Sequence, residues 1–129
     1  MLAVDADVLV RLVTNDDPAQ AGRALSAIER NDIFVGKTVL LELEWVLRYS
    51  YELGPDVIFR TLRNILGLGN LQVEDPTGVA KALAMYGAGI DFADALHLIS
   101  CGPAQRFGTF DSKLARKARR HDVVEVVSI

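Results

Sequence analysis

Four acidic residues occupy positions where a carboxylate could do chemistry: Asp5, Glu42, Asp94 and Asp111. Mg²⁺ and Mn²⁺ prefer oxygen ligands and are usually held by a few carboxylates and waters. Such an ion lowers the pKa of a bound water and neutralises charge on a phosphate. Carboxylates gathered without a cation would repel one another and raise their own pKa values. The set of four therefore predicts a metal site suited to phosphate chemistry.

Several of these acids also have an ordinary explanation as helix caps. Asp7 lies nearer the first predicted helix than Asp5 does and is expected to cap it, which leaves Asp5 without an obvious structural task. Asp91 is well placed to cap a later helix, and Asp94 then falls at its third position, where a carboxylate favours the helix dipole. Asp111 also precedes a predicted helix. The functional interpretation therefore depends on the four acids as a set, each on a different element.

Glu42 is the most informative of the four. It lies in a helix predicted over residues 38–53 and shares a stripe with Val39, Val46 and Tyr49. A carboxylate on an apolar stripe is costly unless it is paired or bound to a cation. The alternative is a residue at the edge of the helix that reaches water.

Other polar residues are explained without chemistry. Glu44 lies four residues before Arg48, and this spacing predicts a surface ion pair worth a few tenths of a kcal/mol. His97 is expected to pack or to donate a hydrogen bond rather than to bind metal, and zinc-ligand spacing is absent. Cys101, the one cysteine, lies in an apolar segment and is expected to be buried and inert. A single thiol fits a reducing compartment.

The elements that must position these residues alternate along the chain. Strands are predicted at residues 2–4, 33–35, 71–73, 106–109 and 123–127. Helices are predicted at residues 7–14, 18–30, 38–53, 56–66, 76–86, 91–101 and 112–121. This order indicates one α/β domain over residues 1–129, a three-layer α/β/α sandwich around a parallel sheet. Ligands bind outside the carboxyl ends of such strands, where Asp5 and Asp111 lie.

The charge distribution separates a basic segment from an acidic body. Residues 111–129 carry five basic groups against three acids, and residues 1–110 carry nine against fourteen. Lys113, Arg116 and Lys117 could therefore face a phosphate backbone, the alternative being a solvated helix face. No apolar run approaches the roughly 20 residues that span a bilayer. Asp5 and Asp7 stand where a secretory signal would carry positive charge, so a cytoplasmic protein is expected.

Four segments resemble the motifs of PIN domains, in the form found in VapC-type toxins. They are residues 2–11 (LAVDADVLVR), 40–48 (LLELEWVLR), 91–97 (DFADALH) and 108–115 (GTFDSKLA). The resemblance implies a five-stranded parallel sheet and Mg²⁺- or Mn²⁺-dependent cleavage of RNA by the toxin of a toxin–antitoxin pair. It carries the acidic site onto Asp5, Glu42, Asp94 and Asp111.

Two further positions follow from the resemblance. Thr109 matches a hydroxyl position near the site. Asp7 stands where the family more often has Asn or Ser, so it is a departure. An added carboxylate at that place could change the number of metal ions or the position of water. We therefore expect Asp7 to lie next to the metal ligands and to influence them without binding the metal itself.

The resemblance also implies two protein partners, a cognate antitoxin and a second copy of the chain. Large apolar groups crowd two consecutive helices, and we expect some of them to stay exposed as an interaction patch: Trp45, Tyr49, Tyr51, Phe59 and Leu62. The alternative is that all five pack into the core. An antitoxin could inhibit by placing an Arg or Lys among the four acids, because such a cation would take the place of the metal.

Two other functions remain open on the residues alone. In a phosphatase of the haloacid-dehalogenase type, Asp5 would attack phosphorus and Asp7 would act as acid, but Glu42 would have no role. A receiver-like signalling domain, which is not an enzyme, would need an acidic pair after the first strand and a lysine after the last. Neither feature is clear in this sequence.

Overall fold

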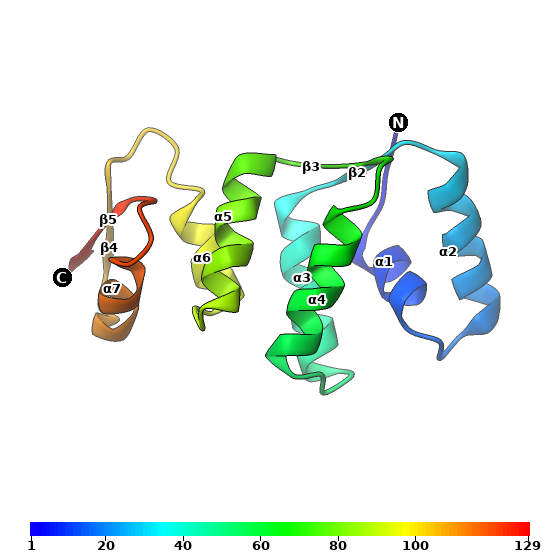
Figure 1. Ribbon diagram of the computed structural model, residues 1–129, viewed down its shortest axis with the longest axis horizontal. Helices are drawn as coiled ribbons and strands as arrows, with labels where there is room; N and C mark the ends of the chain where they lie inside the picture. The colour runs from blue at the N-terminus through cyan, green and yellow to red at the C-terminus, as the bar shows by residue number, and fades with distance from the viewer. The chain divides into compact units, whose positions relative to one another are not determined.

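The computed structural model describes all of residues 1–129 and divides into two compact units, Met1–Glu74 and Asp75–Ile129 (Figure 1). Each unit has its own parallel sheet and its own helices. No helix is long and apolar enough to cross a membrane.

The first unit contains a three-stranded parallel sheet in the order β1-β2-β3, with four helices. Its elements are β1 (Leu2–Ala3), α1 (Ala6–Val13), α2 (Pro18–Arg30), β2 (Ile33–Val35), α3 (Lys37–Tyr49), α4 (Pro55–Leu66) and β3 (Leu71–Val73). Ile33 is opposite Leu2 on one side and Leu71 on the other. Helix α1 packs against α2 and α3, and α3 packs against α4, as Figure 1 shows.

The second unit contains a two-stranded parallel sheet and three helices. Its elements are α5 (Pro76–Gly87), α6 (Phe92–Leu98), β4 (Arg106–Thr109), α7 (Ser112–Ala118) and β5 (Glu125–Ser128). Helices α5 and α6 pack together, and the Tyr86 and Phe92 rings meet edge to face with centroids 5.3 Å apart. Helix α7 packs on β4 and β5.

The α/β class with parallel strands is confirmed, and all five predicted strands are present. The main differences are at helix ends. Helix α3 ends at Tyr49 rather than at residue 53, because the chain reverses through Glu52, whose φ is +54°, before α4 begins. Helix α6 ends at Leu98, and Cys101 is half-buried beyond it rather than buried within a helix.

The core of the first unit is built on the apolar face of α3. Leu40, Leu43 and Leu47 recur at helical spacing and are fully buried. Glu44 lies on the same face and is also fully buried. Arg48 pairs with it: Nη2 donates a hydrogen bond of 3.0 Å to Oε1, and Nε lies at ion-pair distance, 2.9 Å, from Oε2. The predicted pair therefore forms, but the prediction that it lies at the surface is wrong.

The predicted aromatic patch is only partly exposed. Trp45 and Tyr49 are 54% and 58% exposed, with ring centroids 5.0 Å apart. Tyr51 and Phe59 are half-buried. Leu62 is fully buried and therefore does not belong to the exposed part. The exposed part is a tilted aromatic pair on α3.

We expect Glu44→Ala to lower the free energy of unfolding by about 3 kcal/mol. Removing one partner of a buried ion pair leaves an uncompensated charge, and Arg48 still reaches solvent enough to keep the loss at the low end of the range. Urea unfolding measures the change. The matched control is Glu42→Ala, which removes an exposed carboxylate from the same helix and should cost under about 0.5 kcal/mol. If both variants lowered the free energy of unfolding equally, the Glu44–Arg48 pair would not contribute to stability as a buried ion pair.

Candidate functional site

Asp5 caps helix α1. It follows β1 in an extended conformation, and its Oδ1 accepts a hydrogen bond of 3.1 Å from the Val8 backbone N–H. The expectation that Asp7 is the cap is therefore wrong, because the helix begins at Ala6 and Asp7 lies within its first turn. Capping uses one carboxylate oxygen and fixes the side chain. The Oδ2 atom of Asp5 makes no hydrogen bond and remains available to a ligand.

A cavity of about 310 Å³ lies beside Asp5, between α1 and α2. Its polar lining consists of Asp5, Asp7, Arg11, Gln20 and Arg23, and its apolar lining consists of Val8, Ala24 and Ala27. Asp7 is exposed and has no helix-capping bond. The carboxylate of Asp7 therefore lines the same cavity as that of Asp5.

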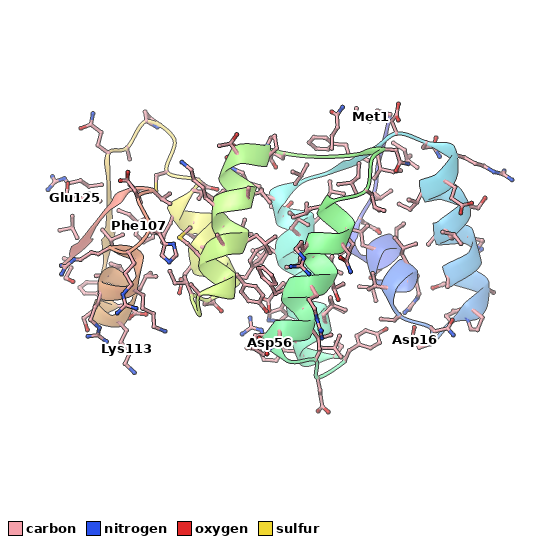
Figure 2. All side chains as sticks on the ribbon, in the orientation of Figure 1. Met1, Asp16, Asp56, Phe107, Lys113 and Glu125 are labelled. Carbon is pink, nitrogen blue, oxygen red and sulfur yellow. The ribbon has the colours of Figure 1, made fainter.

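A polar network ties α1 to its neighbours through Arg11. Its Nε donates to Gln20 Oε1 at 2.6 Å, and its Nη1 lies 3.1 Å from Asp16 Oδ1 and 3.1 Å from the Tyr51 hydroxyl. Tyr51 also donates to Asp16 Oδ2 at 2.5 Å. Figure 2 labels Asp16 in the loop between α1 and α2. The bond from Tyr51 holds the pKa of Asp16 below its usual value, and Arg11 acts in the same direction. The network fixes the helix that begins at Asp5 against α2 and the segment after α3.

Glu42 is exposed on α3, two positions before the buried Glu44. The residues with which it shares a stripe are half-buried or exposed: Val39, Val46 and Tyr49. The expectation that Glu42 lies on a costly apolar stripe is therefore wrong, because the buried face of α3 is the opposite one. Its carboxylate is exposed to solvent and accessible to a ligand.

Asp94 lies at the third position of α6, as predicted, and Asp91 caps that helix through a 3.2 Å bond from the Asp94 backbone N–H. Partial burial raises the pKa of the Asp94 carboxyl, and the carboxylates of Asp91 and Asp111 raise it further. His97 acts in the opposite direction. The second unit therefore brings Asp94 within electrostatic reach of Asp111, although seventeen residues separate them in the chain.

Asp111 caps α7, with its Oδ1 accepting from the Leu114 backbone N–H at 3.0 Å. Thr109, at the end of β4, accepts from the Asp111 backbone N–H through Oγ1 at 3.0 Å. The Thr109 hydroxyl thus holds the backbone of Asp111, which is a supporting role of the kind predicted for this residue. As at Asp5, the second carboxylate oxygen of Asp111 makes no hydrogen bond.

The carboxylates fit a divalent cation by their chemistry. Partial burial raises the pKa of Asp94 most, the nearby carboxylates of Asp91 and Asp111 raise it further, and a cation would relieve that repulsion. Asp5 and Asp111 each present one uncommitted oxygen. Within neither unit do three or more Asp, Glu, His or Cys side chains lie close enough together to hold a metal ion. Mg²⁺ commonly takes only one or two carboxylates and keeps several waters, so this arrangement is compatible with such an ion.

A family model for the PIN domain matches residues 2–120, which covers nearly all of the first unit and most of the second but not β5. The chain belongs to the PIN domain family. Comparison with curated proteins gives no match, and comparison with solved structures gives none either. PIN domains are in general nucleases, and hence hydrolases, and they generally use divalent metal ions. The assignment agrees with the acidic set and favours neither the phosphatase nor the receiver-like alternative.

The structure adds groups that the sequence pattern did not single out. Asp91 was expected only as a cap, yet its carboxylate contributes to the field at Asp94. Its spacing of three residues from Asp94 is the signal that could have revealed this. Arg11, Gln20 and Arg23 lie around the cavity beside Asp5. Their proximity depends on how α1 packs on α2, which spacing along one helix cannot show.

We expect Asp94→Asn to raise the melting temperature by roughly 1–3 °C at pH 7 in EDTA. A raised carboxyl pKa means that the folded state disfavours the ionised form, so stability falls as the pH rises through the raised pKa. An uncharged amide avoids that loss. The gain should shrink on acidification, because wild-type Asp94 then takes up its proton. Calorimetric melting from pH 4 to 7 measures this.

Asp32→Asn provides the control for the Asp94 variant, because Asp32 is an exposed acid of the first unit. It should leave the melting temperature unchanged at every pH. An Asp94→Asn variant that melts below wild type at pH 7, or a gain that grows on acidification, would show that repulsion at Asp94 is not significant.

Proposed function

We propose that this PIN domain is a cytoplasmic, metal-dependent endoribonuclease and the toxin of a type II toxin–antitoxin pair. The observation that carries the nuclease proposal is the set of acids at the four PIN motif positions: Asp5, Glu42, Asp94 and Asp111. Two of them, Asp94 and Asp111, interact electrostatically within one unit. The choice of RNA and of the toxin role is supported by the resemblance of the motif segments to VapC-type toxins.

In this proposal Asp5, Asp94 and Asp111 would hold Mg²⁺ or Mn²⁺, and Glu42 would bind or orient the ion. When bound, such an ion supplies a water of lowered pKa and neutralises charge on the phosphate under attack. The helix caps at Asp5 and Asp111 hold their carboxylates at fixed backbone positions, with one oxygen of each left for the ligand. Thr109 fixes the backbone of Asp111, and Asp7 places a further negative charge beside Asp5.

The exposed face of α7 would guide RNA. Lys113, Arg116 and Lys117 are all exposed, and Figure 2 labels Lys113 in the second unit. Lys117 also has a structural contact, since its Nζ donates to the Gly89 carbonyl at 3.3 Å. Lys113 and Arg116 make no such contact. We therefore expect Lys113 and Arg116 to contribute more to RNA binding than Lys117 does.

The nuclease proposal is tested with a circular single-stranded RNA, which only an endonuclease can open. Wild type should linearise it with Mn²⁺ or Mg²⁺ and not in EDTA. Asp5→Asn, Asp94→Asn and Asp111→Asn should each lower the rate at least about 100-fold, because each removes a proposed ligand. Glu42→Gln should also lower it, whereas Asp32→Asn should not. Full activity in EDTA or in Asp5→Asn, or equal cutting of circular DNA, would overturn the proposal.

RNA binding measured in EDTA, where cleavage is stopped, separates the basic face from the metal ligands. The double variant Lys113→Ala, Arg116→Ala should bind RNA more weakly, with a shallower dependence on salt by about 0.7 per lost phosphate contact. Lys117→Ala is the comparison on the same helix and should lose less. Unchanged affinity and salt slope in the double variant would leave α7 as a solvated face.

The proposed partners are RNA, a cognate antitoxin and a second copy of the chain. The exposed Trp45–Tyr49 pair, with the Arg48 guanidinium 4.7 Å from the Tyr49 ring centroid, supports a protein interface on α3. We expect wild type to sediment as a dimer at tens of micromolar and Trp45→Ala, Tyr49→Ala to sediment as a monomer. Co-expression with the adjacent reading frame tests the antitoxin. A wild-type monomer that finds no partner there would contradict the toxin role and leave the nuclease proposal intact.

A further inference from the structure

Phe110 is an anomaly on the surface of the second unit. Its side chain is 86% exposed, more than any other large apolar side chain in the chain, including the two terminal residues Met1 and Ile129. It lies between β4 and α7, directly before Asp111. Single exposed apolar residues are common on proteins and need no explanation by themselves. The surroundings of Phe110 are what make it informative.

The residues on either side of Phe110 are fixed. The Asp111 backbone N–H donates to Thr109 Oγ1 at 3.0 Å, across Phe110. Asp111 in turn caps α7 through the Leu114 backbone N–H. These bonds hold the backbone at the junction between strand and helix. The aromatic ring is exposed to solvent at this fixed turn, one residue from a proposed metal ligand.

The chain segment that contains Phe110 is rich in basic residues. From Arg106 to Arg120 the chain carries six basic residues and one acid, Asp111. Lys113 and Arg116 are exposed and follow Phe110 by three and six residues. An exposed aromatic ring beside basic side chains is the arrangement by which proteins bind single-stranded nucleic acid, with bases stacked on the ring and phosphates paired with the cations.

We propose that Phe110 stacks on an unpaired RNA base next to the phosphate that is cleaved. This inference rests on the nuclease function proposed above and adds a substrate-binding residue to it. Because the ring would touch a base in both the bound substrate and the transition state, it contributes uniform binding. Its loss should therefore raise KM and leave kcat nearly unchanged.

Cleavage kinetics on a linear single-stranded RNA of one cleavage site test the stacking directly. Phe110→Ala should raise KM about 5- to 100-fold, the range expected for losing one base stack. Phe110→Tyr keeps a ring and should remain within about 3-fold of wild type, whereas Phe110→Leu keeps only apolar bulk and should resemble Ala. The control is Leu25→Ala, which removes an exposed apolar side chain from α2 and should have no effect.

Substrates with one abasic nucleotide, placed in turn on each side of the cleaved bond, identify the stacked base. At one position the abasic RNA should raise the KM of wild type as much as Phe110→Ala does on intact RNA. The same abasic RNA should not raise the KM of Phe110→Ala any further. If the abasic substrate and Phe110→Ala each raised KM and their effects multiplied when combined, the proposal would be overturned, because the ring and the base would then not touch.

RNA binding by fluorescence anisotropy in EDTA makes the test independent of cleavage. A wild type that does not cleave refutes the nuclease function, while weaker binding by Phe110→Ala than by wild type still supports the stack. Equal affinities, or a wild type that does not bind RNA, overturn it. A Phe110→Ala variant that melts several degrees lower identifies a packing residue instead. A change in oligomeric mass without a change in RNA affinity identifies a protein interface.

Discussion

The hydrogen bond by which an aspartate caps a helix is the constraint on which both units depend. Five of the seven helices begin at an aspartate whose carboxylate accepts a backbone N–H: Asp5, Asp17, Asp75, Asp91 and Asp111. The first N–H groups of a helix have no partner within it, and a cap of this kind stabilises the protein by about 1 kcal/mol. The bond also determines where the chain turns from strand to helix.

The same bond prepares two carboxylates for chemistry. Asp5 and Asp111 each follow a strand, and each commits one oxygen to its helix. A side chain fixed in this way has already lost its rotational freedom, so a cation that binds the second oxygen does not have to order it. Structural and functional roles are therefore not alternatives for these two residues. The exposed Phe110 ring lies at the same fixed turn, directly before Asp111.

Charge in this protein is partly balanced by hydrogen bonds and partly left uncompensated. Asp16 is satisfied by Tyr51, Thr14 and Arg11, and Glu44 is paired with Arg48 inside the core. The carboxylate of Asp94, by contrast, is partly buried and lies near two other acids, and these effects raise its pKa although His97 opposes them. Paired carboxylates such as Asp16 and Glu44 stabilise the fold. A carboxylate with a raised pKa, such as Asp94, is typical of a functional site.

The sequence by itself determined the order and type of the elements, because strand and helix signals are local. Apolar runs, the Asp-Pro start of α2 and the Gly-Pro stop between α3 and α4 predicted most boundaries to within two residues. It also identified the acidic motifs, since their order along the chain is a property of sequence. Tertiary structure decided which face of each element is buried. The period of α3 placed Glu42 and Glu44 on different faces but could not say that the face of Glu44 is the buried one. The fold likewise decided that the carboxylate of Asp111 raises the pKa of Asp94. It also decided that the Phe110 side chain is exposed. These features depend on contacts between residues far apart in the chain, and no local pattern carries that information.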